Sequence, residues 1–234
     1  MIFLRSALFF IWFAVSSTVL AITFLPILLL PRRFNVWLAQ TWARVLFWGL
    51  RIFAGIDYRV VGPVPRGPVL VAAKHMSIWD TLALGMILHQ PGIILKKQLL
   101  RVPFYGWYLS RAAAIPIDRD GGSETLRRMV RDSKKTLVEG RTLLIFPEGT
   151  RKKPGAAPDY KPGVAALYSM LNVACVPVAL DSGIYWRGFI KRPGTITLEF
   201  LPEIAPGLKR PAFMALLEER IETASNALAA EGRR

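Results

Sequence analysis

The chain has 234 residues, of which 53% are hydrophobic, and its 31 Lys and Arg outnumber its 16 Asp and Glu for a net charge of +15. This length suits one ordinary domain with an appended segment, and the hydrophobicity excludes a disordered chain. The surplus of positive charge favours anionic partners, such as phosphorylated small molecules, anionic lipids or nucleic acid. The single cysteine, Cys175, excludes an internal disulfide, and the two histidines, His75 and His89, leave few candidates for catalysis.

Near the N-terminus, residues 6–30 form an uncharged apolar run that contains Pro26 and stops at Pro31. A helix of this length extends about 37 Å, which is enough to cross a hydrocarbon core of about 30 Å. A cleaved signal peptide, with its cleavage site near Ala21, is the alternative. Because the apolar run continues to Leu30, beyond the point at which a cleavage region turns polar, we expect the segment to be retained.

Residues 34–55 are less apolar and rich in tryptophan, which is typical of a helix at the depth of lipid headgroups. An amphipathic helix packed on a domain, and a helical pair that dips into one leaflet, are alternatives that hydropathy does not separate. The basic residues after the apolar run are Arg32, Arg33, Arg44 and Arg51. By the positive-inside rule they place the following domain in the cytoplasm. We expect residues 1–55 to anchor the chain to the inner membrane and residues 56–234 to form a domain on its cytoplasmic side.

From residue 56 onward, short β-rich runs alternate with longer helical stretches. This alternation predicts an α/β fold with a mostly parallel central sheet that is covered by helices on both faces. The expected strands are Tyr58–Val61, Val69–Ala73, Gly92–Leu95, Ala114–Pro116, Thr142–Phe146, Ala174–Leu180 and Thr195–Phe200. The expected helices are Asp80–Leu88, Phe104–Ser110, Ser123–Glu139, Gly163–Leu171 and Pro211–Ala230.

His75 lies in the segment VLVAAKHMSIWD, residues 69–80, where an apolar strand runs into a polar turn. Strand ends are where open α/β sheets present reactive groups. If Ser77 caps a helix that begins near Ile78, Asp80 lies in its first turn and can fold back toward the imidazole. A carboxylate on one ring nitrogen leaves the other nitrogen free to accept a proton, so the nucleophile would be a hydroxyl of the substrate. The alternative is a histidine that makes a structural cap.

Two further strand ends carry charged groups. The segment TLLIFPEGTRKK, residues 142–153, contains Glu148, Gly149, Thr150 and Arg151. The planar guanidinium of Arg151 suits a phosphate or a carboxylate, and Glu148 is placed to hold a glycerol-type hydroxyl or to brace Arg151. The segment IPIDR, residues 115–119, places Asp118 and Arg119 at another strand end. One basic strand end is usually a solvated loop, whereas three such ends in one small domain indicate a site.

Motifs for several other chemistries are missing from the sequence: it has no G-x-S-x-G, no G-x-x-x-x-G-K-[ST] and no H-E-x-x-H. His89 precedes a turn and is expected at the surface, and Cys175 is expected to be a small buried hydrophobe. We expect no metal and no resident cofactor. The basic residues are dispersed and accompany no nucleic-acid-binding motif, so no nucleic-acid partner is expected.

Four blocks, KHMSIWD, IPIDR, FPEGTR and VPVAL, occur in order and resemble those of the glycerolipid acyltransferases, most closely the 1-acyl-sn-glycerol-3-phosphate acyltransferases. The H-x-x-x-x-D and F-P-E-G-T-R blocks together form a specific signature. The resemblance covers residues 56–205 and implies a glycerol-3-phosphate acyltransferase-like fold. The chain departs from many relatives at Lys74, where they have Asn, and its IPIDR block lacks a glycine that is common there.

This resemblance implies that His75 is the general base for the sn-2 hydroxyl of lysophosphatidate and that Asp80 orients it. The hydroxyl would attack the thioester of acyl-CoA or acyl carrier protein, and backbone amides near Gly149 would stabilise the oxyanion. The apolar segment VPFYGW, residues 102–107, is expected at the membrane face, where the lysolipid enters. The residues implied to bind substrate are Glu148, Gly149, Thr150, Arg151, Arg119, Lys96 and Lys97.

Two other functions stay open at this point. One is an acyltransferase of the same mechanism that acts on another lysolipid, such as a lyso-ornithine lipid or a lysophospholipid. The other is a non-catalytic relative that only binds membranes. The intact set of His75, Asp80, Glu148 and Arg151 argues against the second, because a silent relative has little physical reason to retain it.

Overall fold

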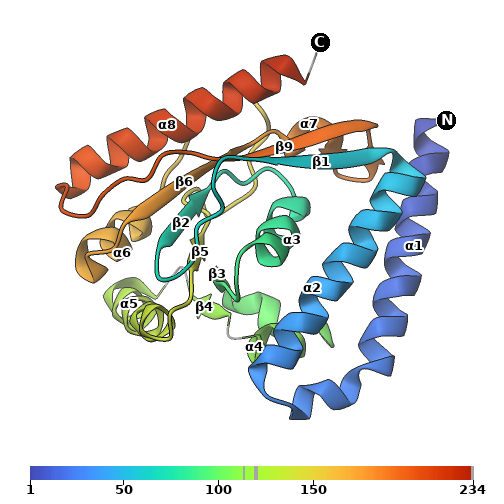
Figure 1. Ribbon diagram of the computed structural model, residues 1–234, viewed down its shortest axis with the longest axis horizontal. Coiled ribbons are helices and arrows are strands. Elements are labelled where there is room, and N and C mark those ends of the chain that lie inside the picture. The colour runs from blue at the N-terminus through green and yellow to red at the C-terminus, as the bar shows by residue number, and fades with distance from the viewer. Residues whose placement is uncertain (113, 119–120, 233–234) are drawn as a thin grey trace.

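The computed structural model describes residues 1–112, 114–118 and 121–232, and within these ranges seven strands form one central sheet (Figure 1). They are β1 (Ile56–Val61), β2 (Leu70–Ala73), β3 (Gly92–Lys96), β4 (Ile115–Ile117), β5 (Leu143–Ile145), β6 (Cys175–Leu180) and β9 (Gly194–Phe200). Their order across the sheet is β1-β9-β6-β2-β5-β3-β4. Two further strands, β7 (Trp186–Arg187) and β8 (Ile190–Lys191), form a separate antiparallel pair.

The helices alternate with these strands along the chain. They are α1 (Ile2–Thr23), α2 (Arg32–Gly49), α3 (Ile78–Ile87), α4 (Tyr105–Arg111), α5 (Gly122–Val138), α6 (Gly163–Leu171), α7 (Ser182–Tyr185) and α8 (Arg210–Glu231). Each strand and helix that the sequence predicts beyond residue 56 is present, with ends that differ by one or two residues. The α/β class and the mostly parallel sheet are therefore confirmed.

The one antiparallel junction in the sheet joins β6 to β9, where Val178 pairs with Phe200 and Leu180 pairs with Leu198. The chain between these strands forms only α7 and the β7–β8 pair. A parallel neighbour requires a crossover connection, usually a helix, so this short excursion returns β9 beside β6 in the opposite direction. β1 then pairs parallel with β9 at the edge of the sheet. The sequence pattern of alternating strands and helices contains no signal for this reversal.

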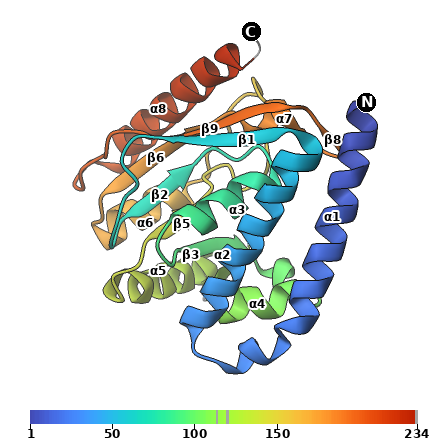
Figure 2. The ribbon, with the colours of Figure 1, turned by 45° about the vertical axis from the view of Figure 1, so that its right-hand side comes forward.

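Both faces of the sheet are covered by helices, as Figure 2 shows. Because side chains alternate along a strand, Leu70 and Ala72 of β2 face one hydrophobic core and Val71 and Ala73 face another. Residues of α5, α6 and α8 complete the first core, and residues of α1, α2 and α3 complete the second. This double burial explains why the central strands are continuous apolar runs.

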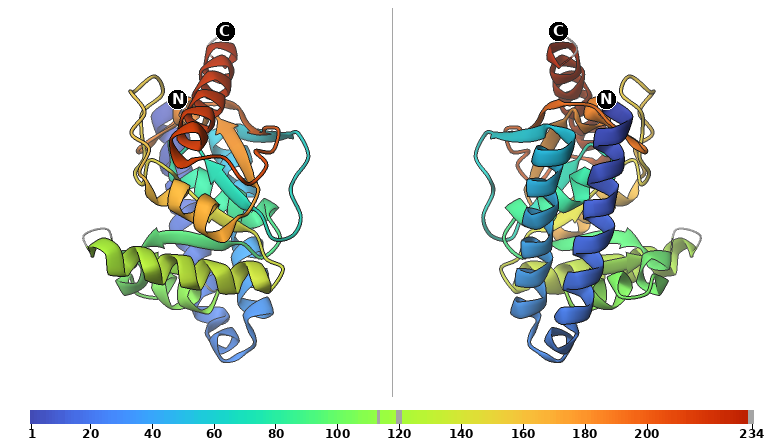
Figure 3. Two further views of the ribbon diagram at one scale, coloured as in Figure 1. Left: turned by 90° about the vertical axis from the view of Figure 1, so that its left-hand side faces the viewer. Right: turned by 90° about the vertical axis from the view of Figure 1, so that its right-hand side faces the viewer.

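The two N-terminal helices form an antiparallel pair along one side of the molecule (Figure 3). The expected single helix over residues 6–30 is wrong, because α1 ends at Thr23. A short 3-10 helix, Leu25–Leu29, follows it with Pro26 at its second position, and the chain reverses direction there. The start of α1 lies close to the residues that follow α2, because the Arg5 guanidinium donates to the Phe53 carbonyl at 3.0 Å. The N-terminus and the start of the sheet therefore lie at the same end of this pair.

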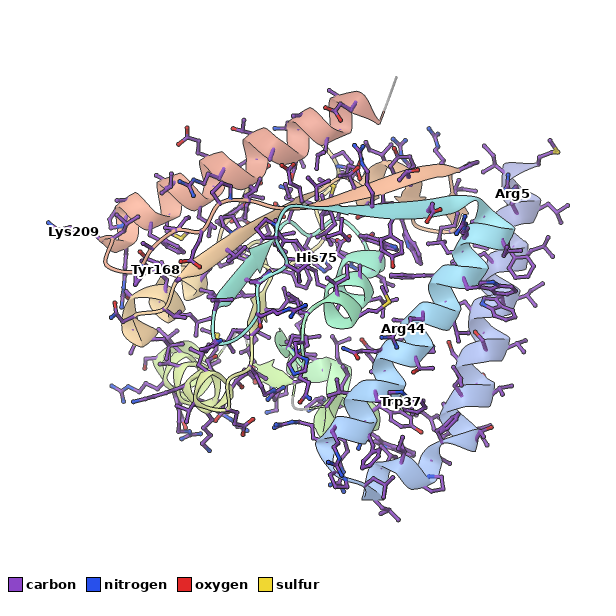
Figure 4. All side chains as sticks on the ribbon, viewed as in Figure 1. Arg5, Trp37, Arg44, His75, Tyr168 and Lys209 are labelled. Atoms are coloured by element: carbon purple, nitrogen blue, oxygen red, sulfur yellow. The ribbon has the colours of Figure 1, made fainter. Side chains whose placement is uncertain are left out.

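Among the described residues, α1 is the one helix that is long and apolar enough to cross a membrane. Only 11% of its most apolar window is buried in the protein. Its exposed large apolar residues are Ile2, Phe3, Leu4, Leu8, Ile11, Val15, Val19 and Ile22. α2 buries one face and exposes Trp37 and Trp48, and Figure 4 shows Trp37 near the start of this helix. An exposed apolar surface of this extent is typical of a membrane-binding face.

Candidate active site

The carboxyl ends of β2, β5, β3 and β4 lie next to one another, because these strands are neighbours in the sheet and run parallel. Lys74 and His75 follow β2, the turn that contains Glu148 follows β5, Lys96 ends β3 and Asp118 follows β4. Figure 4 shows His75 in the loop between β2 and α3. The strand ends that the sequence singles out therefore share one edge of the sheet.

The turn between β2 and α3 brings His75 and Asp80 together. Ser77 is the N-cap of α3, and the Asp80 carboxylate accepts a hydrogen bond from the Ser77 amide at 2.7 Å, which forms a capping box. The same fold-back places Oδ2 of Asp80 3.0 Å from Nδ1 of His75. The helix start at Ile78 and this contact have the geometry expected from the sequence.

Asp80 is completely buried, and its two oxygens accept several hydrogen bonds besides the one from His75. Oδ2 accepts from the Met76 amide at 2.6 Å, and Oδ1 accepts from the Ser77 hydroxyl at 3.0 Å and from the Ser182 hydroxyl. Such a set of donors stabilises a buried carboxylate in its charged form. Sequence reasoning missed Ser182, although it lies two residues after VPVAL, which forms most of β6, the strand next to β2 in the sheet.

The His75 ring is held in place from two sides. The ring stacks on Phe146 with ring centroids 4.1 Å apart. The backbone carbonyl of His75 accepts a hydrogen bond from the Lys152 amide at 2.8 Å, so the F-P-E-G-T-R block and the residue after it directly support the H-x-x-x-x-D block. Because Asp80 only accepts, Nδ1 of His75 carries the proton. No hydrogen bond reaches Nε2 from the residues described, and the side chain is 15% exposed. Nε2 is thus available to a substrate.

Glu148 pairs with Lys74, and not with Arg151 as one sequence interpretation held. Oε1 of Glu148 lies 2.9 Å from Nζ of Lys74, and both side chains are buried. Burial raises the pKa of Glu148, and the hydrogen bond and charge of Lys74 oppose that rise. Oε2 of Glu148 is also buried, and within the described part of the chain it has no hydrogen-bond partner. Lys74, the departure from many relatives, is therefore the direct partner of the motif glutamate.

The turn after Glu148 presents backbone amides and one guanidinium. Gly149 adopts a φ of 64°, which favours glycine, and its amide is already bonded to the Phe146 carbonyl at 2.9 Å. In the described ranges no backbone acceptor takes the amides of Thr150 and Arg151. Arg151 is exposed, and it forms no ion pair with a described residue.

The other predicted substrate-binding residues lie further along the same edge. Lys96 and Lys97 are exposed at the end of β3, and Nζ of Lys97 lies 4.0 Å from the Asp118 carboxylate. Arg119 lies outside the described residues. As expected, His89 is exposed and Cys175 is buried. No cluster of three or more His, Cys, Asp or Glu side chains that could hold a metal occurs in the ranges the structure describes.

An apolar cavity of about 350 Å³ lies between α1, α2, α3 and α4. On α3 its wall begins with Thr81, the residue after Asp80, and continues with Leu82 and Gly85. Phe104 and Tyr105, from the apolar segment expected at the membrane face, form part of the opposite wall. The cavity thus lies between α1 and α2 and the first turn of α3, the turn that also carries Asp80.

Comparison with known proteins places this geometry in a family. Residues 56–181 match the family model described as Acyltransferase. A 1-acyl-sn-glycerol-3-phosphate acyltransferase of Pseudomonas aeruginosa is 33% identical over 94% of this chain and 88% of its own length. A lyso-ornithine lipid O-acyltransferase of the same organism is 33% identical over 58% of this chain and 52% of its own length. The crystal structure of the 1-acyl-sn-glycerophosphate acyltransferase of Thermotoga maritima is 22% identical and has the same fold, with a TM-score of 0.78 over 98% of both chains.

Proposed function

Since this chain belongs to the acyltransferase family, we propose that it transfers an acyl chain from a thioester to the sn-2 hydroxyl of 1-acyl-sn-glycerol-3-phosphate, which gives phosphatidate. The observation that carries the proposal is the His75–Asp80 pair, whose Nε2 is free of described partners. The nearby hydroxyls of Ser77 and Ser182 are both engaged with Asp80. The attacking hydroxyl therefore belongs to the substrate, and no acyl-enzyme is formed.

In this mechanism Nε2 of His75 removes the proton of the sn-2 hydroxyl as its oxygen attacks the thioester carbonyl. Asp80 stabilises the imidazolium that results. The tetrahedral oxyanion accepts hydrogen bonds from the amides of Thr150 and Arg151, which have no backbone acceptor among the described residues. When the intermediate collapses, the carbon–sulfur bond breaks and the imidazolium returns its proton to the leaving thiolate. His75 is thus neutral again and the acylated product is released, without a covalent acyl-enzyme intermediate.

The acceptor's phosphate is held by the basic groups along the sheet edge. The Arg151 guanidinium is exposed and free of carboxylate partners among the described residues, which suits bidentate contact with a phosphate. Lys96 and Lys97, exposed at the end of β3, add positive potential along this edge, and Oε2 of Glu148 accepts a hydrogen bond from the acceptor. The apolar cavity beside α3 takes a fatty chain. Acyl-CoA and acyl carrier protein are both polyanionic thioesters that suit the basic edge.

We place the protein on the cytoplasmic face of the inner membrane, with residues 1–55 as its anchor and residues 56–234 as the acyltransferase domain. The antiparallel pair supports an anchor that enters one leaflet, because a crossing α1 would require the amphipathic α2 to cross as well. The exposed apolar face of α1 and the tryptophans of α2 suit that depth. The arginines of α2 attract the anionic lipids of the cytoplasmic leaflet.

The match to a lyso-ornithine lipid O-acyltransferase supports a second acceptor of the same chemistry. The purified protein would be assayed with labelled acyl-CoA and acyl carrier protein thioesters on lysophosphatidate and on lyso-ornithine lipid. We expect phosphatidate to form and Arg151→Ala to raise the KM for lysophosphatidate at least about tenfold, because a charge-assisted contact is lost. Arg127→Ala, an exposed change on α5, is the control. Transfer to lyso-ornithine lipid alone would overturn the proposed acceptor.

A further inference from the structure

A buried ionic network joins the active site to the C-terminal helix. Nζ of Lys74 donates to Oε1 of Glu148 at 2.9 Å and to Oε1 of Glu222, on α8, at 2.6 Å. The side chains of Lys74 and Glu148 are 3% and 1% exposed, and that of Glu222 is 17% exposed. One buried ammonium therefore serves two carboxylates, of which only Glu148 lies in the region that matches the family model.

The position of Glu222 on α8 is not explained by packing of the helix. α8 buries a stripe of residues against the sheet and α6, namely Phe213, Leu217, Ile221, Ser225 and Leu228. Glu222 lies beside this stripe, directly after Ile221, and its carboxylate contacts Lys74. A carboxylate removed from water is costly unless it is paired, and a helix that served only as a cover would need none there. The contact with Lys74 is therefore a specific link to the site.

The same carboxylate also holds the loop that follows the F-P-E-G-T-R block. The Tyr160 hydroxyl donates to Oε1 of Glu222 at 3.0 Å. Burial, together with the negative charge of Glu222, raises the pKa of Tyr160, so the hydroxyl remains a donor at neutral pH. The next residue, Lys161, bonds through its amide to the Pro147 carbonyl at 2.9 Å. Residues 151–162 are thus fastened to the turn at one side and to α8 at the other.

We propose that Glu222 is a positioning residue of the active site, which holds the Lys74 ammonium against Glu148 and, through Tyr160, holds residues 151–162 against the site. Glu222 itself touches no substrate. It keeps Oε1 of Glu148 on Lys74, so that Oε2, which has no hydrogen-bond partner among the described residues, is left for the acceptor. This inference rests on the proposed function, in which Glu148 and the start of the loop bind the lysolipid.

The test compares Glu222→Ala and Glu222→Gln with Glu219→Ala, an exposed change on the same helix. Initial rates are measured with lysophosphatidate and with the acyl thioester varied in turn. We expect Glu222→Ala to raise the KM for lysophosphatidate about five- to tenfold and to leave the KM for the thioester within about twofold. Glu222→Gln keeps an oxygen for Tyr160 and Lys74, so it should recover part of the loss. Glu219→Ala should match the wild type.

A second variant and a second readout keep the inference testable if Glu222→Ala fails to fold. Tyr160→Phe removes only the hydroxyl that reaches Glu222, and it should raise the KM for lysophosphatidate in the same direction. Amide hydrogen exchange of residues 151–162 should quicken most in Tyr160→Phe, less in Glu222→Gln, which keeps an oxygen for the Tyr160 hydroxyl, and not in Glu219→Ala. Unchanged KM and unchanged exchange in folded variants would overturn the role of Glu222. A wild type that fails to acylate lysophosphatidate would instead overturn the proposed function. The exchange data would still show whether Glu222 holds residues 151–162 in place.

Discussion

Asp80 is the residue whose surroundings best explain the proposed chemistry. Its buried carboxylate orients the imidazole of His75 while two backbone amides and two hydroxyls fix it in turn. One of these hydroxyls belongs to Ser182, which approaches from the neighbouring strand end. A hydrogen bond to a charged group is worth about 1.5–3 kcal/mol, so each donor has a measurable share in the orientation of the pair.

Ser182→Ala should therefore lower kcat about tenfold and leave the KM for lysophosphatidate unchanged, because it loosens Asp80 without touching the acceptor. Steady-state kinetics of the purified variant measure both quantities. Ser110→Ala, whose hydroxyl bonds only to a carbonyl of its own helix, is the control and should be neutral. A wild-type kcat for Ser182→Ala would show that this hydroxyl does not support the base.

Asp181, the neighbour of Ser182, is predicted to lower the stability of the fold as pH rises through about 6. Burial raises the pKa of this carboxyl to about 6, although its Oδ1 accepts the Thr197 amide at 2.8 Å. The folded state then holds the proton more tightly than the unfolded chain, whose Asp has a pKa of about 3.9, so stability falls as pH rises from about 4 to 6. The full cost, at most about 3 kcal/mol, applies above pH 6.

Asp181→Asn keeps the oxygen that accepts the Thr197 amide and removes the charge. Its Tm should exceed that of the wild type by several degrees at pH 8, and the gain should shrink as pH falls below 6. Asp159→Asn is the contrasting variant, since a hydrogen bond to Lys161 holds the pKa of Asp159 below its ordinary value. That change should not raise Tm at pH 8. An equal gain for Asp181→Asn at pH 5 and pH 8 would contradict the assignment.

Among the secondary-structure elements, those that the sequence predicts well are the ones with a local signal. The apolar runs of the central strands and the Ser77 cap of α3 each consist of residues close together in the sequence. The positions of these elements, and the approach of Asp80 to His75, therefore follow from the sequence pattern. The shared sheet edge also follows, because parallel strands align their carboxyl ends. These regularities are enough to find most of the site.

The features that sequence reasoning missed all depend on partners that are distant along the chain. Lys74 forms a hydrogen bond to Glu222 on α8. Ser182, which follows β6, forms one to Asp80, which follows the neighbouring strand β2. The reversal of β9 depends on a connection too short for a crossover helix. Nothing in the local pattern around these residues specifies the partner, because the contact exists only once the sheet has formed.

The exposed apolar face of α1, which we propose enters the membrane, can be tested directly. Ile11 and Val15 are 60% and 56% exposed and lie one turn apart. Ile11→Lys with Val15→Lys should sharply reduce sedimentation with vesicles of anionic phospholipid, because each lysine brings a charge to a surface that must enter lipid. Val138→Lys, at an exposed apolar position on α5, should bind like the wild type. Undiminished binding by the double variant would contradict the membrane-facing assignment of α1.

At the scale of the whole molecule, the site of the proposed acyl transfer lies beside an apolar surface that suits contact with lipid. The helix pair and the apolar cavity lie on one side of α3, and the basic sheet edge with His75 lies at its first turn. A lysolipid can thus keep its chain among apolar side chains while its headgroup reaches the base. The net charge of +15 adds attraction to anionic lipid.

The measurement that tests this account most directly is phosphatidate formation from lysophosphatidate and a labelled acyl thioester by wild type, His75→Ala and His89→Ala. The account predicts that the wild type and His89→Ala transfer the chain at similar rates, because His89 is exposed and remote from the sheet edge. His75→Ala should be about 10²- to 10⁴-fold slower with its fold intact, because the general base is lost. Wild-type transfer by His75→Ala would contradict the central claim that this imidazole activates the hydroxyl.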